Sequence, residues 1–272
     1  MDWIVTERQR LHSLFGVFLA PEVSAAIVPL ARPALRLGGQ GTAVRLGGPP
    51  LLPPAADWPR WAGRPLDFLA VVDFAELAAV LRQPGMPGKG RAAFYYASRT
   101  PRPWGSRPEE RDGWRVFTGE LVESEPPPGV TSAPARTLGA APFLSLPAPQ
   151  EPVLQQVESR YSGILTVYEQ LYAAWLQHLW PDDPVHQIGG WPVIVQRPVA
   201  PEAQHASSGR DPDTVTPEEQ ETAAGEGDEW SPLLQLDSDD HLGWHWGDPG
   251  RVYFCNRRSA PLEDSWLILQ AR

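Results

Sequence analysis

Six side chains that could bind a metal ion or carry a proton lie close together near the C-terminal end of the sequence. They are Asp237, Asp239, Asp240, His241, His245 and Asp248. An Asp-x-Asp-Asp turn offers carboxylate oxygens of the kind that bind Ca²⁺ or Mg²⁺, and two histidines four residues apart would share one face of a helix, as in zinc sites. The chemistry that this spacing allows is metal-dependent hydrolysis.

The residues around this cluster favour a turn over a metal site. Gly243 and Gly247 indicate turns and a strand instead of a helix, and in a strand the two histidines would lie about 13 Å apart. The segment also lacks the glycine and glutamate positions of a calcium-binding loop. We therefore expect a turn in which the carboxylates accept backbone N–H hydrogen bonds, and we predict no metal or cofactor. If a metal binds nevertheless, its candidate ligands are Asp237, Asp239, Asp240 and Asp248.

A second hypothesis is acid–base catalysis by Asp73 and Asp237, which end two similar strand-like segments. Two carboxylates that converge on one cleft can act as general acid and base. Aspartates in such positions also commonly cap the following segment. Cys255, the one cysteine, lies in an apolar segment, so we expect a buried small hydrophobe rather than a nucleophile. The sequence favours a protein that is not an enzyme.

A third hypothesis is a binding cleft with aromatic walls and a few polar anchors. The sequence has 12 tryptophans, several of them beside glycine or proline. Aromatic walls with a few polar groups suit a small ligand or a peptide, whereas the alternative role of such tryptophans is to pack the core and the edges of a sheet. The residues that would line the cleft are Gln187, Trp191, Trp230, Gln235, Trp244, Trp246 and Arg251.

Composition argues against several classes of function for this chain of 272 residues. Its net charge is −10, but residues 201–229 hold nine acidic residues and one arginine, so the remainder is close to neutral. We expect no basic surface for nucleic acid, because the pair Arg257-Arg258 is too small to provide one and should be solvated. No apolar run is long enough to cross a membrane, and residues 1–30 do not resemble a signal peptide, so we expect a cytoplasmic protein.

The spacing of apolar and turn residues predicts the elements that carry these sites. Trp3–Leu19 has helical spacing, and Val153–Leu179 presents one apolar face along a single helix about 40 Å long. The expected strands are 34–37, 43–46, 65–73, 90–96 and 114–118, with a short helix at 74–81. From about 199 to 229 the chain is acidic and poor in large apolar residues, which predicts a disordered loop. The expected units are an N-terminal helix (1–30), a first β-rich repeat with a proline-rich tail (31–150), and the long helix with a second β-rich repeat (151–272).

The two β-rich units contain three matching blocks in the same order. The pairs of blocks are Leu46–Leu52 with Ile188–Ile194, Phe68–Asp73 with Pro232–Asp237, and Gly90–Tyr95 with Gly250–Cys255. Each unit thus has a Gly-Gly turn, a strand that ends in aspartate, a Gly-Arg turn and another strand. We predict an α+β fold with a duplicated β-rich unit, in two related halves, and a long bridging helix in a single compact body.

These blocks resemble the YwqG-like family of bacterial proteins, a domain family of unknown function. The resemblance covers the chain from about Ala34 to the C-terminus. It rests on Leu46–Pro53, Pro65–Asp73, Trp104-Gly105, Gly113–Val116, His186–Pro192, Leu233–Asp240 and Trp246–Arg251. It implies an α+β fold with duplicated β-structure and implies no particular reaction.

We therefore expect a monomeric module that binds a partner through a surface around Leu233–Arg251. The partner is a protein or a small molecule, and immunity to a toxin is one form of this role that the kind of family suggests. The alternative is a metal-dependent hydrolase that uses the aspartates between 237 and 248. Carboxylates that point into one concavity would favour the hydrolase, and carboxylates that accept backbone bonds within turns would favour the binding module.

Overall fold

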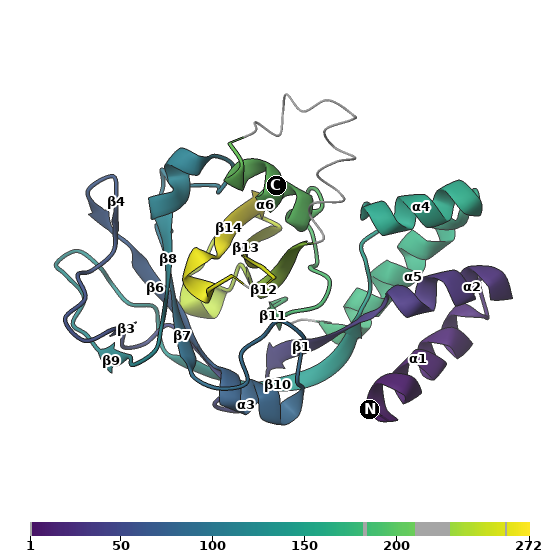
Figure 1. Cartoon of the computed structure of the whole chain (residues 1–272), viewed down its shortest axis with the longest axis horizontal. Helices are drawn as coiled ribbons and strands as arrows, with labels where there is room; N and C mark the ends of the chain where they lie inside the picture. The colour runs from purple at the N-terminus through teal and green to yellow at the C-terminus, as the bar shows by residue number, and fades with distance from the viewer. Residues whose placement is uncertain (1, 182–183, 210–228, 259) are drawn as a thin grey trace.

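The computed structural model of the chain describes residues 2–181, 184–209, 229–258 and 260–272. Its main feature is an antiparallel sheet of ten strands in the order β14-β13-β12-β11-β1-β10-β2-β6-β7-β8 (Figure 1). In that order the strands are β14 (Trp266–Ala271), β13 (Gly250–Arg257), β12 (Trp230–Asp237), β11 (Gln187–Ile188), β1 (Arg32–Gly38), β10 (Arg136–Ser145), β2 (Val44–Leu46), β6 (Asp67–Asp73), β7 (Arg91–Tyr96) and β8 (Trp114–Thr118). Helices accompany this sheet, so the α+β class expected from the sequence is confirmed.

The sheet curls until its two edge strands, β8 and β14, lie against each other (Figure 1). Trp114 and Trp266 pack edge to face with ring centroids 5.0 Å apart, and the indole N–H of Trp114 donates to the carbonyl of Ser265 at 3.0 Å. Phe94 on β7 and Phe254 on β13 meet inside the curl at 5.0 Å. The largest apolar core therefore fills the inside of the curled sheet, which is nearly closed.

The matched blocks lie on either side of the central strands β1 and β10. One side has the order β2-β6-β7-β8 and the other has β11-β12-β13-β14. The middle strand pair on each side contains a bulge. It lies between Phe68 and Ala70 in β6–β7 and between Pro232 and Leu234 in β12–β13.

Four helices form a lobe beside the sheet, at the right of Figure 1. This helical lobe consists of α1 (Asp2–Phe15), α2 (Pro21–Ile27), α4 (Pro152–Arg160) and α5 (Ile164–Leu179). Its own core packs Phe15, Ile27 and Tyr168 against Leu144 and Leu146, at the end of β10 and just after it. The lobe is thus a second apolar layer that rests on the central strands.

The single helix predicted from Val153 to Leu179 is divided in the structure. α4 ends at Arg160 and α5 begins at Ile164, with Gly163 between them in the left-handed region at φ 89°. The side chain of Glu158 accepts the N–H groups of Gly163 and Leu165 at 2.6 and 3.0 Å, which satisfies the first donors of α5. The prediction of one long bridging helix was therefore wrong, because the left-handed backbone at Gly163 interrupts the helical conformation and Glu158 caps the start of a second helix.

The sequence predicted a disordered loop from about 199 to 229, but the first part of this segment is a buried helix. α6 (Val199–Ser207) packs on β12 and β14 and buries Val199, Ala203 and Ala206, which recur at helical spacing. The prediction was wrong for this first part, because the acidic composition of the whole stretch masked a short apolar stripe. Residues 210–228 of the predicted loop lie outside the described residues.

Short elements complete the described chain. The small strands are β3 (Leu51–Leu52) paired with β9 (Val122–Glu123), and β4 (Arg60–Trp61) paired with β5 (Arg64–Pro65). The remaining helices are α3 (Phe74–Val80) and the 3₁₀ turns η1 (Val28–Leu30), η2 (Pro108–Gly113), η4 (Asp240–Leu242) and η5 (Leu262–Asp264). Among the described helices, none has the length and apolar character that crossing a bilayer requires.

Candidate functional site

The two glutamines predicted as ligand anchors instead hold a segment of their own chain. Gln187 and Gln235 face each other in the β11–β12 register, and both are buried. Residues 189–197, which we call the strap, cross the sheet without regular secondary structure. The amide of Gln187 donates to the carbonyls of Gly189 and Trp191, both at 2.7 Å, and Gln235 accepts the N–H of Val193 at 2.9 Å.

The next strands hold the rest of the strap in the same way. The Tyr253 hydroxyl donates to the carbonyl of Val193 at 2.8 Å, and Arg251 donates to the same oxygen at 3.2 Å. Gln270 accepts the N–H groups of Val195 and Gln196, each at 3.0 Å. A buried segment outside the strand ladder needs such partners for its backbone, so these side chains fix the strap across the sheet.

The four tryptophans predicted for the cleft walls, Trp191, Trp230, Trp244 and Trp246, are core residues that are each at most 8% exposed. The indole of Trp191 donates to Leu30, that of Trp230 to Gln204 and that of Trp246 to Asp237. The rings of Trp244 and Trp246 lie 5.7 Å apart. Trp191 and Trp230 also carry a guanidinium on one face, from Arg32 at 3.5 Å and Arg257 at 5.1 Å. Their burial leaves no ring face free to form the predicted aromatic cleft.

Asp239 is the most strongly held of the predicted carboxylates. It is buried, accepts from Arg136 at 2.8 Å and from the N–H of His241 at 2.9 Å, and lies 3.2 Å from Nε2 of His186. The N–H of Asp237 donates to Nδ1 of His186, so the ring proton sits on Nε2 and points at Asp239. Burial opposes ionisation, but the hydrogen bond and charge interaction with His186, the charge of Arg136 and the backbone donor lower the pKa of Asp239 to about 2.

The other predicted carboxylates do not join Asp239 in a common site. Asp237 accepts from Arg251 at 3.2 Å and from the N–H of Val185 at 2.9 Å. Asp240 and Asp248 are exposed, as are the two neighbouring histidines, His241 and His245. Within the described ranges, no three histidine, cysteine or acidic side chains are placed to share a metal ion.

Asp73 and Asp237 have separate roles in different parts of the sheet. Asp73 is the N-cap of α3, where its carboxylate accepts the N–H groups of Ala75 and Glu76 at 2.9 and 3.2 Å. In the strand order, β6 and β12 are separated by β2, β10, β1 and β11. The arrangement offers no support for the predicted catalytic pair. Cys255 is fully buried, and this burial raises the pKa of its thiol.

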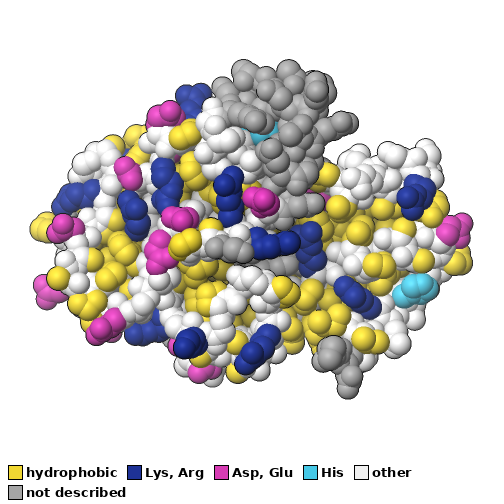
Figure 2. Space-filling view, viewed as in Figure 1, with side chains coloured by type: hydrophobic (Ala, Val, Ile, Leu, Met, Phe, Trp, Pro, Cys, Tyr) yellow, Lys and Arg dark blue, Asp and Glu magenta, His cyan; other side chains and the backbone are white. Residues whose placement is uncertain are grey.

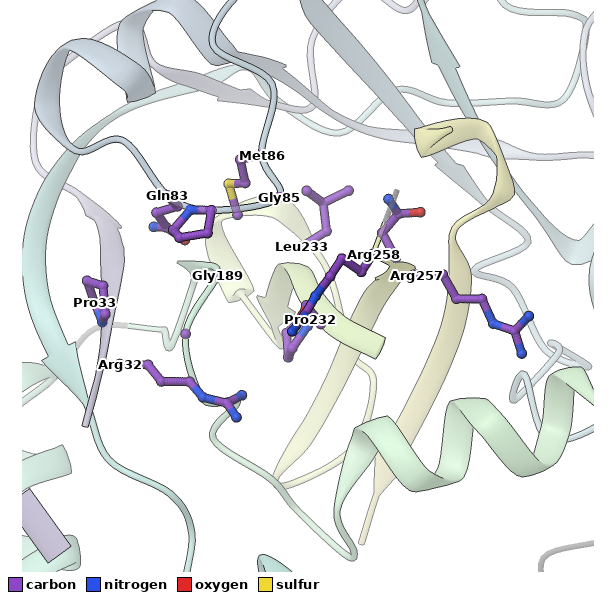
Figure 3. A pocket seen from close by; sticks show the side chains of 14 residues that line it. Arg32, Pro33, Gln83, Gly85, Met86, Gly189, Pro232, Leu233, Arg257 and Arg258 are labelled. Atoms are coloured by element: carbon purple, nitrogen blue, oxygen red, sulfur yellow. The ribbon is translucent and has the colours of Figure 1, made fainter. Parts of the chain in front are cut away.

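A cleft of about 540 Å³ opens beside the Gly189-Gly190 turn, where the strap begins. Its walls come from the start of β1, the loop after α3, the start of β12 and the end of β13 (Figure 3). The described residues that line it include three arginines, Arg32, Arg257 and Arg258, and no acidic residue. Figure 2 shows basic side chains gathered near the middle of its visible face, where the sheet meets the helical lobe.

The cleft combines this positive charge with apolar walls. Leu233 and Met86 line it close to each other, and Pro33 and Pro232 add apolar surface (Figure 3). Gly189 lies at φ 66°, and a Cβ there would stand 1.8 Å from Oε1 of Gln83. The glycine therefore allows the loop after α3 to approach the strap, which shapes one wall of the cleft.

Sequence reasoning missed most of this cleft. Arg32 and the loop 83–86 carry no local motif, and Arg257-Arg258 was interpreted as a solvated pair. The signal that could have located the cleft is the Gly189-Gly190 turn, since adjacent glycines permit a close approach of other segments. His186 and Arg136, the partners of Asp239, were also missed because they are distant in the sequence.

The chain matches the family described as "Domain of unknown function (DUF1963)" over residues 44–261. The matched range contains the strap, β12, β13 and most of the cleft, and it leaves out α1 and β1. No curated protein matches the chain. Because the match covers well over half of the sequence, this protein belongs to the family of the domain of unknown function DUF1963.

Proposed function

We propose that this protein is a binding module whose ligand occupies the cleft beside the Gly189-Gly190 turn. The observation that carries the proposal is a cleft of about 540 Å³ whose described lining holds three arginines and no acidic residue, in a chain with a net charge of −10. Small-molecule sites typically have volumes of about 300–1,000 Å³, mostly apolar walls and a few polar groups. The cleft has this size and this mixture of surfaces.

The cleft supports binding better than the alternatives do. A metal-dependent hydrolase would need the aspartates at 237–248 to share one concavity, and two of them are bound to arginines while two are exposed. A toxin-neutralising surface around Leu233–Arg251 would need exposed anchors, and the tryptophans there are buried. The proposal therefore places the ligand in the cleft and the predicted residues Gln187, Gln235 and Arg251 in the scaffold behind it.

The internal duplication and the YwqG-like relationship belong to the same proposal. The matching strand orders on either side of β1 and β10, and the bulge in each inner pairing, support an origin of the sheet from two related halves. The resemblance of the blocks supports the YwqG-like assignment within the wider family, and with it a bacterial, cytoplasmic protein. Comparison of the two halves in a superposition of their strands tests the duplication directly.

Thermal unfolding in the presence of a panel of metabolites tests the binding function. The blocking variant is Ser231→Trp, since Ser231 is exposed and lines the cleft, and the matched control is Ser13→Trp on the exposed side of α1. A ligand at about 100 times its Kd adds roughly 2.7 kcal/mol to the stability of the folded state. We expect such a ligand to raise the melting temperature of the wild type and of Ser13→Trp but not of Ser231→Trp. A panel that stabilises Ser231→Trp as well as the wild type, or stabilises neither, contradicts the proposal.

A further inference from the structure

We propose that the ligand of the cleft carries an unbranched apolar tail, which passes Met86 and lies in a second cavity against α3. This inference rests on the proposed binding function and names the part of the ligand that the second cavity recognises. The second cavity, which we call the tail pocket, has a volume of about 200 Å³ and lies between residues 74–81 and the loop 82–88.

The wall that α3 and the residue after it give to the tail pocket is apolar. The side chains on this wall recur at helical spacing and belong to Phe74, Leu77, Ala78 and Leu81. Phe74 and Leu77 are each 2% exposed and belong to the core inside the curled sheet, whereas Ala78 and Leu81 are only partly buried. The apolar stripe therefore continues from the core into the tail pocket, where the loop leaves part of it uncovered.

The tail pocket and the cleft share a wall. Gln83 and Met86 line both cavities, and Figure 3 shows these two residues at the border of the cleft. A Cβ on Gly189 would stand 3.0 Å from the terminal methyl group of Met86, so the tip of the Met86 side chain lies at the start of the strap. The unbranched and flexible Met86 side chain is therefore the partition, and a change of its rotamer joins the two cavities.

The loop that carries Met86 is lightly tethered. In the part of the chain that the structure describes, residues 84–89 make one backbone hydrogen bond, from the N–H of Met86 to the carbonyl of Gln83 at 3.3 Å. The side-chain amide of Gln83 donates to the carbonyl of Ile188 at 3.4 Å, which is longer than usual. Segments with so few hydrogen bonds open locally at low cost, so a ligand can displace Met86 without disturbing the sheet.

The size and the surface of the tail pocket suit part of a ligand and not a whole one. Its volume of about 200 Å³ is smaller than the roughly 300–1,000 Å³ of a complete small-molecule site, whereas the cleft beside it has that size. An unbranched alkyl chain has the same thickness as the methionine side chain that it would displace. Such a chain also gains affinity from the apolar wall, about fourfold for each buried CH₂ group.

Isothermal titration calorimetry of the full chain with hexanoate and decanoate tests this inference. The two acids have the same headgroup, which suits a cleft whose described lining holds no acidic residue, so the difference between them reports on the tail alone. Decanoate has four more CH₂ groups than hexanoate. We expect the wild type to bind decanoate at least about 30-fold more tightly than hexanoate.

Two substitutions on α3 separate the tail pocket from general effects. Ala78→Trp is the blocking variant, because Ala78 lines the tail pocket and not the cleft, and Ala79→Trp is the matched control, because Ala79 is exposed and lines neither. We expect Ala78→Trp to weaken decanoate binding at least about tenfold and to change hexanoate binding less than about twofold, with no effect of Ala79→Trp on either. Ala78→Leu fills less of the tail pocket and should cause a smaller loss, which keeps the test if the tryptophan variant does not fold.

Each other outcome counts against a specific part of the inference. Equal affinities of the wild type for the two acids, or no saturable binding of either, overturn the tail pocket. Equal losses of both acids in Ala78→Trp, or equal effects of Ala78→Trp and Ala79→Trp on decanoate, overturn it as well. If Ser231→Trp abolishes hexanoate binding while chain length has no effect, the tail pocket is overturned but the cleft remains the binding site. Binding of both acids that Ser231→Trp leaves unchanged overturns the proposed function itself.

Discussion

The side-chain oxygen of Gln235 accepts the backbone N–H of Val193 at 2.9 Å, and its amide donates to the carbonyl of Val185 at 2.7 Å. One buried side chain thus satisfies two backbone groups on segments that no strand ladder reaches. Replacement by leucine would leave the buried N–H of Val193 and the partly buried carbonyl of Val185 without this partner, and an unpaired buried group costs about 1–3 kcal/mol. We expect Gln235→Leu to lower the free energy of unfolding by about 3 kcal/mol, measured by urea denaturation.

Gln196 provides the matched control for this substitution. Its amide donates to the carbonyl of Ala271 at 2.6 Å, but the side chain is exposed, so water can replace the bond. Gln196→Leu should therefore change the free energy of unfolding by less than about 1 kcal/mol. Equal losses in the two variants would show that Gln235 does not hold the strap.

The lowered pKa of the Asp239 carboxyl should make the protein lose stability in acid. Its pKa is lowered in the folded protein from 3.8 to about 2, so its contribution is complete above about pH 4 and is lost as the pH falls toward 2. The shift corresponds to about 2 kcal/mol at neutral pH. We expect Asp239→Asn to be less stable than the wild type by about this amount at pH 7, and the difference to close near pH 2, in urea denaturation across this range. Asp240→Asn, whose side chain is exposed, is the matched control for the substitution itself.

The buried Glu151 carboxyl should make the stability of the fold depend on pH in the opposite direction. Burial raises its pKa from 4.5 to about 7, and the attraction of Arg32 only partly opposes this. An acid with a raised pKa stabilises the fold below the unfolded value, and that contribution is lost as the pH rises from about 4.5 to 7. We expect Glu151→Gln to be more stable than the wild type by about 3 kcal/mol at pH 8 and equal to it near pH 4. Thermal unfolding of the wild type, Glu151→Gln and the exposed control Glu169→Gln at both pH values measures this, and a constant difference would refute the assignment.

Alanine substitutions at two glycines with positive φ distinguish the cost of backbone strain from the cost of a steric clash. Gly163 lies at φ 89° and a Cβ there would meet open space, whereas at Gly105, with φ 74°, a Cβ would stand 1.6 Å from the carbonyl oxygen of Leu267. Gly163→Ala should cost about 1 kcal/mol, from the left-handed backbone alone. Gly105→Ala should cost more than about 3 kcal/mol in urea denaturation, because it also forces β14 away from residues 104–105. Similar costs for the two variants would contradict the close contact at the sheet edges.

The strands were predictable because their signals are local. β8 (Trp114–Thr118) has the range expected from the sequence, and β6 and β7 differ from theirs by two residues or fewer at each end. Alternation, β-branched residues and flanking glycines act within a few positions, so such patterns indicate these elements without knowledge of the fold. α6 was missed because its apolar stripe is short and the surrounding acidic composition points the other way.

The site was less predictable, because the role of a polar side chain depends on what crosses its strand. Gln187 and Gln235 have the chemistry of ligand anchors, yet a segment of the same chain occupies their polar atoms. The cleft is built from segments far apart in the sequence, so Arg32 and Arg258 are brought together only by the completed sheet. Their sequence positions carry no sign of this proximity.

The meeting of the two sheet edges has a consequence for the synthesis of the chain. The indole N–H of Trp114 finds its acceptor on Ser265, 151 residues later, and the indole N–H of Trp266 returns to Gly105 across 161 residues. At about 5–20 residues per second, a ribosome needs roughly 8–30 s to make the segment between them. During that interval β8 lacks the cover that Trp266 and η5 give it in the folded protein, and an uncovered edge strand can pair with other chains. Slower translation after β8 would lengthen the time for which this edge strand is uncovered.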